Sequence, residues 1–307
     1  MVLTLRILFF IILLASTINA QEMDTLVDFN KLWDYNDPVA TETKFKDLIP
    51  AAEQSGDLSY KLQLKTQIAR CMSLQRKFED AHQLLDEVEQ ELNEDLKIAT
   101  IRYHLEKGRT FNSANDKGRA EEQFQWAINL STEAGEDFYL VDALHMFAII
   151  KESEEALHYN LEAVNVAEKS EDPRAKKWLG SLYNNIGWTY HDMKMFDKSL
   201  QLFLKAEEWH KEFGSERSYG IARWCVAKGM RMVQRIDEAL EILQTLEVEG
   251  KTDGYTYEEL GECYLIKGNK GKANDYFFKA YELLSQDKWL MENEAKRMAR
   301  LKELSSK

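Results

Sequence analysis

Proline, cysteine and recognisable catalytic motifs are scarce in this chain of 307 residues. It holds 3 Pro, 3 Cys and 6 His, and neither a HExxH nor a CxxC spacing occurs in it. No Gly-x-Ser-x-Gly sequence is present either. These absences argue against a zinc site of known spacing, a disulfide framework and a serine nucleophile on a strand-to-helix turn. We therefore expect no metal, no cofactor and no enzymatic activity.

Positive charge is also in short supply. The chain has 40 Lys and Arg against 53 Asp and Glu, a formal net charge of −13. An acidic protein is a poor match for nucleic acid or for an anionic membrane, so we expect neither as a partner. The few prolines suit helices joined by short turns. Pro38 and Pro173 fit helix starts, whereas Pro50 should kink or end a helix.

Only one long apolar run exists, and it lies at the N-terminus. Arg6 precedes the unbroken run Ile7–Ala15, and the small residue Ala20 follows. This order is typical of a secretory signal peptide over residues 1–20, and the run is too short for a comfortable membrane span. We expect cleavage before Gln21, export to the periplasm or the cell exterior, and no membrane insertion afterwards. An uncleaved anchor is the alternative.

Small and aromatic residues recur at a regular spacing through the rest of the chain. The clearest copy has Tyr183, Gly187 and Tyr190 followed by Ser199 and Phe203, and a second runs from Tyr257 through Gly261 to Phe277. The later small position of each copy recurs every 34 to 43 residues, at Ala81, Ala120, Ala156, Ser199, Ala239 and Ala273. Such a period indicates a repeat of two helices that cross closely at the small residues.

This pattern resembles the tetratricopeptide repeat (TPR) family. Two copies match almost fully and four match in part. The resemblance implies an all-α fold, a right-handed α-solenoid of about seven TPR-like helical hairpins over residues 21–286, with a degenerate first unit at about 28–57. A C-terminal capping helix is expected within 287–307, because Met291, Ala295, Met298 and Leu301 form one apolar stripe. A dimerising helix is the alternative.

The cysteines fit this arrangement. Cys71, Cys225 and Cys263 all fall on first helices of repeats, where small apolar residues are wanted. Buried thiols are the favoured interpretation, and a bridge between Cys225 and Cys263 in neighbouring repeats is the rival one.

The resemblance also implies a binding surface, because first helices line the concave face in this family. The groove residues that it implies share polar, basic or aromatic side chains: Arg70, Arg102, Arg109, Asn184, Asn185, Trp188, His191, Trp224, Lys228 and Arg231, with Glu258, Glu259 and Glu262 forming an acidic end. Asn can bond a peptide backbone, Arg and Lys can pair with carboxylates, and Trp offers rigid contact area. The predicted partner is a protein or an extended peptide with acidic side chains. A solvated face without a ligand, with Trp188 packed on a neighbouring helix, is the alternative.

These observations favour a non-enzymatic, exported protein- or peptide-binding adaptor. The rival interpretation is an extracytoplasmic sensory module, because a signal peptide followed by repeats resembles the extracytoplasmic regions of bacterial sensor kinases. The chain would then be a stand-alone or a truncated relative of such a kinase.

Overall fold

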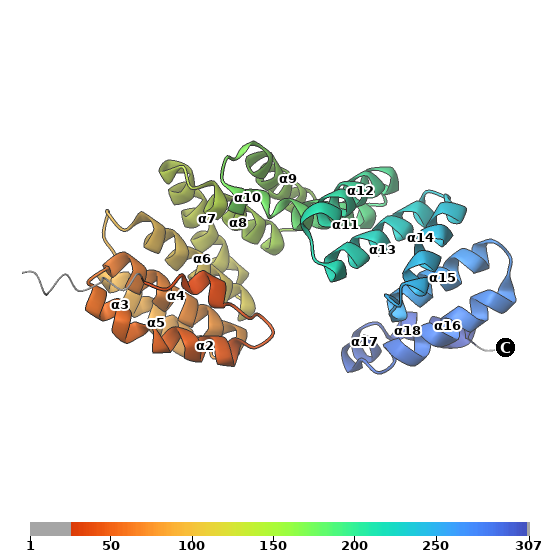
Figure 1. Ribbon diagram of the computed structural model, residues 1–307, viewed down its shortest axis with the longest axis horizontal. Helices are drawn as coiled ribbons and strands as arrows, with labels where there is room; N and C mark the ends of the chain where they lie inside the picture. The colour runs from red at the N-terminus through yellow and green to blue at the C-terminus, as the bar shows by residue number, and fades with distance from the viewer. Residues whose placement is uncertain (1–25, 306–307) are drawn as a thin grey trace, which may run out of the picture. The chain divides into compact units, whose positions relative to one another are not determined.

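The computed structural model describes residues 26–305, and all the regular structure in that range is helical (Figure 1). The predicted signal peptide, residues 1–20, lies outside the described residues. The chain divides into two compact units, Met1–Ala114 and Asn115–Lys307. Each unit has hydrophobic cores of its own.

The described part of unit 1, from residue 26 on, starts with a short 3-10 helix and continues with α-helices. Its elements are η1 (Phe29–Leu32), α2 (Pro38–Asp47), α3 (Ile49–Ser55), α4 (Leu58–Leu74), α5 (Phe78–Glu91) and α6 (Lys97–Ser113). Phe29 and Phe45 are buried together in its first core. Pro38 opens α2, and the helix ends before Pro50, as the sequence predicts.

Unit 2 contains the clearest repeats. Its helices are α7 (Lys117–Ala134), α8 (Asp137–Ile150), α9 (Ser153–Lys169), α10 (Pro173–Lys176), α11 (Leu179–Asp192), α12 (Phe196–Phe213), α13 (Glu216–Met232), α14 (Ile236–Val248), α15 (Gly254–Ile266), α16 (Lys270–Leu284), α17 (Lys288–Asn293) and α18 (Ala295–Leu304). Figure 1 shows α8, α11 and α13 following one another along one side of the stack, with α9, α12 and α14 along the other.

The helix crossings explain the small residues of the pattern. A Cβ added to Gly187 on α11 would lie 2.5 Å from Cε1 of Phe203 on α12, and one added to Gly261 would lie 2.8 Å from the Phe277 ring. Ser199, Ala239 and Ala273 are almost fully buried at the matching positions of the second helices. These crossings confirm the predicted class, an all-helical solenoid of TPR-like hairpins.

The turns inside the hairpins share one backbone conformation. The second residue after the first helix has a positive φ in four of them, at Arg76, Lys194, Gln234 and Gly268, and Asn115 after α6 has one as well. In these four turns the amide that follows bonds back into the helix, as Met195 N does to Tyr190 O at 2.8 Å. This is the Schellman arrangement, which satisfies carbonyls that would otherwise be left open at a helix end.

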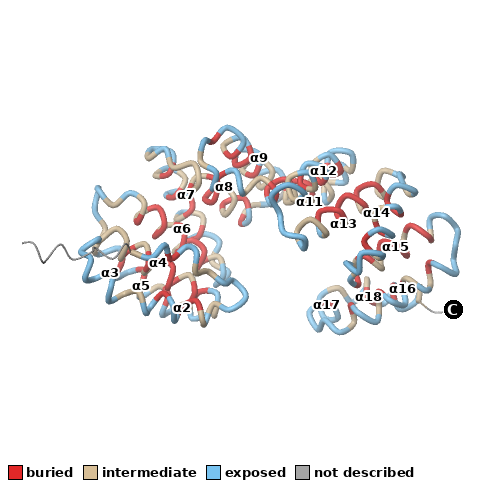
Figure 2. Tube along the Cα trace, in the orientation of Figure 1, coloured by how far each residue is buried: buried red, intermediate tan, exposed pale blue. Residues whose placement is uncertain are grey.

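The buried residues run as stripes along the helices, for example along α13 (Figure 2). Cys71, Cys225 and Cys263 lie in these stripes as buried thiols, which confirms the favoured interpretation. Burial raises the pKa of each thiol to about 12. A thiol with so high a pKa carries little thiolate near neutral pH and is a weak nucleophile.

The C-terminal segment differs from the single capping helix that the sequence predicts. It is split at Glu294 into α17 and α18, and only the second half of the predicted stripe is buried. Met298 and Leu301 pack into the last core, whereas Met291 and Ala295 are exposed. The part of the segment that covers the final hairpin is therefore α18.

Candidate functional site

Three aromatic side chains from successive first helices form a row in unit 2. Trp188 of α11 lies 5.9 Å from Trp224 of α13, and Trp224 lies 6.1 Å from Tyr255 of α15, measured between ring centroids. Trp224 Nε1 donates to the Tyr255 carbonyl at 3.2 Å, which fixes the indole. Trp188 also packs on Phe203, as the alternative interpretation predicts. All three rings of this aromatic row nevertheless stay partly exposed, so they offer rigid apolar contact area.

A buried cluster of charged side chains lies one turn beyond Trp224 on α13. Glu259 of α15 is 2% exposed. Lys228 Nζ donates to its Oε1 at 2.5 Å, and Arg231 Nε donates to its Oε2 at 2.6 Å. Burial alone would raise the pKa of Glu259, but the two cations outweigh it and the pKa is lowered. Lys228 and Arg231 are therefore bound to a carboxylate of their own chain.

The acidic residues of the predicted groove are engaged as well. Arg297 of α18 binds Glu258, with Nε 3.0 Å from Oε1, and Arg300 pairs with Glu262. The structure thus interleaves the charges, so that Glu258, Glu259 and Glu262 do not form the separate acidic end that the sequence predicts. The physical reason is that α13 and α18 bring cations into contact with the carboxylates of α15, where each charge stabilises the other.

Unit 1 contains a second cluster of the same kind. Glu106 of α6 is 4% exposed. It accepts from Arg109 Nη1 at 2.8 Å and from Gln67 Nε2 at 3.2 Å, and Arg70 Nε lies 3.7 Å away. Arg102, the third basic residue predicted here, donates to Asn30 Oδ1 at 2.9 Å. The basic groove residues of unit 1 therefore also have partners within the unit.

A sequence signal for both clusters exists. Arg70 and Lys228 each follow the small residue of a first helix, Ala69 or Ala227. Glu106 and Glu259 each stand two positions before the small residue of the next first helix. Opposite charges at these two repeat positions predict a contact between neighbouring first helices.

The remaining predicted residues lie on α11. Asn184 Oδ1 accepts from the Cys225 thiol at 3.4 Å, which links α11 to α13. Asn185 is partly exposed on the same helix. His191 packs against Trp188 with ring centroids 5.2 Å apart. The predicted residues of α11 and α13 are thus brought together around the aromatic row.

A pocket of about 620 Å³ adjoins Trp224 at the N-terminal end of α13. Its walls come from α13 and from the segment that enters α15: Glu216, Arg217, Gly220, Ile221, Trp224, Lys251, Asp253, Tyr255 and Thr256. The sequence analysis found only Trp224 among these. A sequence signal for the pocket exists on α13. Residues at helical spacing share one face of this helix and extend the predicted groove towards the pocket: Arg217, Ile221, Trp224 and Lys228.

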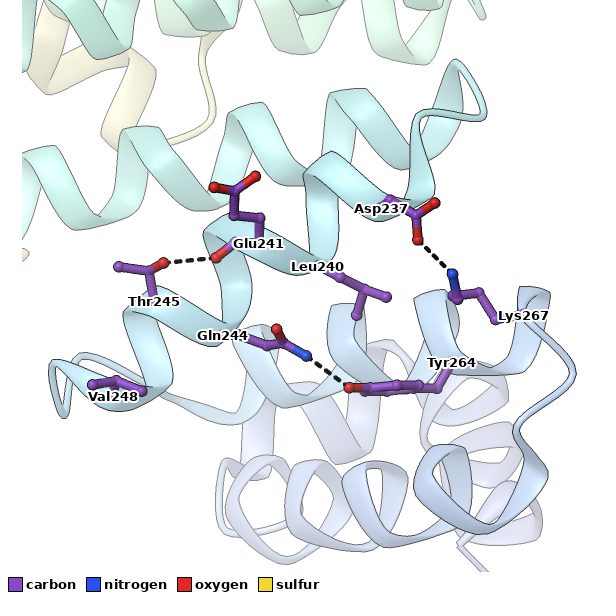
Figure 3. A pocket seen from close by; sticks show the side chains of 8 residues that line it. All are labelled: Asp237, Leu240, Glu241, Gln244, Thr245, Val248, Tyr264 and Lys267. Carbon is purple, nitrogen blue, oxygen red and sulfur yellow. Dashed lines mark hydrogen bonds and ion pairs between the residues drawn. The ribbon is translucent and has the colours of Figure 1, made fainter.

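A second pocket, of about 550 Å³, lies between α14 and α15 and is a weaker candidate (Figure 3). Gln244 Nε2 donates to the Tyr264 hydroxyl at 2.7 Å, Thr245 Oγ1 donates to the Glu241 carbonyl at 2.7 Å, and Lys267 pairs with Asp237. Its polar side chains are therefore largely engaged with one another, so that fewer of them can orient a ligand.

Residues 26–305 hold neither a cluster of metal ligands nor a membrane-spanning helix. Within that range no group of three or more His, Cys, Asp or Glu side chains is arranged to hold a metal ion. None of the helices described there combines the length and the apolar character that crossing a bilayer requires.

The crossings, turns and stacked first helices define the class of this protein, a TPR-like solenoid. In agreement, the tetratricopeptide repeat profile matches residues 180–212, which hold most of α11 and α12. A TPR solenoid is in general a protein-binding fold, since its stacked repeats present an extended surface. No curated protein matches the chain in sequence.

Solved structures with this fold include three informative relatives. A signal transduction ATPase with numerous domains and a tetratricopeptide repeat sensor, from Pyrococcus horikoshii, matches with a TM-score of 0.69 at 15% identity over 85% of this chain and 43% of that one. The apo form of RapI matches with a TM-score of 0.65 at 14% identity, over 85% of this chain and 77% of RapI. PilF of Pseudomonas aeruginosa matches with a TM-score of 0.55 at 13% identity, over 78% of this chain and 99% of PilF. The chain spans less than half of the Pyrococcus protein, and these similarities show the fold alone.

Proposed function

We propose that this protein is a non-enzymatic adaptor that binds an extended segment of a partner protein along the aromatic row of unit 2. The observation that carries the proposal is the row itself, Trp188, Trp224 and Tyr255, partly exposed on three successive first helices. Rigid aromatic side chains with open ring surface are the residues that most often dominate protein interfaces.

The charges beside the aromatic row give a small preference for an acidic partner. Glu259 already neutralises one of the two charges that Lys228 and Arg231 bring, so the cluster keeps one positive charge in excess. That excess favours an acidic side chain in the partner, but the aromatic contacts supply most of the affinity. Asn185 is partly exposed on α11 beside the row and is the proposed contact for the backbone of the bound segment.

We propose that the adaptor acts outside the cytoplasm. Support comes from the sequence Arg6, Ile7–Ala15 and Ala20, the order of a signal peptide. Mass spectrometry of the protein from its native host should find a chain that begins at Gln21. Recovery of intact Met1 in the cytosol would exclude export.

A sensory module is the second candidate. One observation favours it, the similarity in fold to a protein whose repeats are described as a tetratricopeptide repeat sensor. A sensor of this kind would still use a binding surface, so the same site is expected to serve. The two candidates differ in the consequence of binding and not in its place.

A displayed library of random peptides, selected against the chain from Gln21 onward, tests the proposed site. Selected peptides should lose about tenfold or more of their affinity for the variants Trp188→Ala and Trp224→Ala. Trp126→Ala is the matched control, because Trp126 is an equally large side chain that is 55% exposed on α7, outside the row. Circular dichroism confirms that each variant is folded. Peptides that bind all three variants like the wild type would exclude the aromatic row as the site.

A further inference from the structure

Apolar side chains take part in lining the pocket beside Trp224. Ile221, which is 50% exposed, and Trp224 line it from α13, and Tyr255 lines it from α15. Arg297 of α18 lies over the Tyr255 ring at 5.2 Å from its centroid and so bounds the row on that side. A volume of about 620 Å³ is within the range of ordinary ligand pockets, about 300–1,000 Å³.

Gly220 is the feature that packing does not explain. Glycine weakens the interior of a helix relative to alanine, and Gly220 lies one turn inside α13. A Cβ added there would meet nothing within 4 Å. Gly229 of the same helix is different, since its Cβ would lie 3.2 Å from Leu200 Cδ1. Helix packing therefore accounts for Gly229, whereas at Gly220 the missing side chain leaves the pocket open.

The charged residues that line the pocket are balanced in sign. Arg217 and Lys251 are cations, and Glu216 and Asp253 are anions. Asp253 is also engaged in the N-cap of α15, where its Oδ1 accepts from Thr256 N at 2.8 Å and from Thr256 Oγ1 at 2.9 Å. Charges balanced in this way attract neither sign of charge strongly, while Ile221, Trp224 and Tyr255 favour apolar surface.

From these observations we infer that the pocket receives one large uncharged side chain of the bound segment, such as Leu, Met, Phe or Trp, as its anchor. The inference rests on the proposed function and adds the specificity of the site. The anchor enters beside Gly220, packs on Trp224 and Tyr255, and sets the position of the rest of the segment along the aromatic row. An aromatic-walled pocket filled by one partner side chain is the arrangement from which interface hot spots arise.

Gly220→Leu is the test. Gly220 lines the pocket, so a leucine side chain at this position would occupy the space meant for the partner's anchor. Leucine is a better helix former than glycine and meets no atom at the Cβ, so the variant should melt no lower than the wild type. Its affinity for the selected peptides should fall about tenfold or more. The matched control is Gly118→Leu on α7, where the nearest atom to an added Cβ is 4.0 Å away, and its affinity should be unchanged.

The peptides provide the second arm of the experiment. The selected sequences should share one apolar position, and replacing it by Asp should weaken binding to the wild type but add little to the loss in Gly220→Leu. Such non-additivity places the two side chains in contact. A charged residue at the shared position would overturn the inference.

The failures of the two proposals can be told apart. Peptides that bind Gly220→Leu like the wild type, yet lose affinity for Trp188→Ala, would overturn the pocket inference and leave the adaptor function standing. Peptides that are insensitive to Trp188→Ala and Trp224→Ala would overturn the proposed site and the inference together.

Discussion

At the scale of single residues, Glu259 shows how one buried carboxylate joins two helices, because it binds both Lys228 and Arg231. Glu259 carries its charge in a position that is 2% exposed, and both of its oxygens accept from cations of α13. A buried charge is tolerated only when it is paired in this way. The cluster therefore has a structural role in the seam between α13 and α15, in addition to any part in binding.

Glu259→Gln should destabilise the protein strongly. Removing one partner from a buried pair typically costs about 3–5 kcal/mol, because the remaining charges lose their compensation. Glu262→Gln is the matched control, since Glu262 pairs with Arg300, whose side chain is 49% exposed, and such a pair contributes about 0.2–1 kcal/mol. Urea unfolding followed by tryptophan fluorescence compares the two. Equal losses would show that Glu259 has no special role.

The same cluster predicts a pH dependence. The folded-state pKa of Glu259 is lowered below its ordinary value of 4.5, chiefly because Lys228 and Arg231 outweigh the effect of burial. A lowered pKa gives stability that is complete above the unfolded pKa and is lost as the pH falls through the folded pKa. The stability gap between wild type and Glu259→Gln should therefore be constant above pH 4.5 and narrow below it. Unfolding midpoints measured against pH check this, and a gap that widens in acid would contradict the assignment.

At the scale of the element, the close crossing of the two helices of a hairpin depends on glycine, which has no side chain. Gly187 lets α11 approach α12 so closely that the Phe203 ring occupies the place of a Cβ. The crossing is local in sequence, because its two helices are joined by a short turn. This is why the pattern of small and aromatic residues could predict it.

Gly187→Ala should destabilise the protein by about 1–3 kcal/mol, because one added methyl group must displace the Phe203 ring. Gly118→Ala is the control in the first turn of α7, where the added Cβ has room, and alanine there should not destabilise the protein. Thermal unfolding followed by circular dichroism measures both. A Gly187→Ala variant as stable as the wild type would mean that this crossing is not close-packed in solution.

The features that the sequence did not predict are contacts between elements from different hairpins. Glu259 meets Lys228 across 31 positions of the chain, and Arg297 meets Glu258 across 39. Helical periodicity shows which face of a helix a residue occupies but not which charge of the next helix it meets; for Lys228 and Glu259 that pairing emerges only when the matching positions of successive repeats are compared. The break at Glu294 was missed for a similar reason, since an apolar stripe of helical period continues through it.

At the scale of the whole molecule, a net charge of −13 surrounds a site whose own charges nearly cancel. Long-range electrostatics therefore repel an acidic partner weakly, while the cluster around Glu259 attracts it weakly. Both effects are screened by salt, with a Debye length of about 10 Å at 0.1 M. The apolar contacts of the aromatic row and the pocket are not screened.

Binding of a selected peptide should accordingly depend little on salt. Because the excess charge of the cluster is equivalent to one partly exposed ion pair, worth about 0.2–1 kcal/mol, we expect the affinity to change by less than about fivefold between low and high salt. Titrations at a series of NaCl concentrations measure this. Glu259→Gln, where it remains folded, frees two cations and should bind an acidic peptide with a steeper salt dependence. A steep dependence already in the wild type would mean that Lys228 and Arg231 leave Glu259 to bind the partner, and the acidic preference predicted from the sequence would then regain its weight.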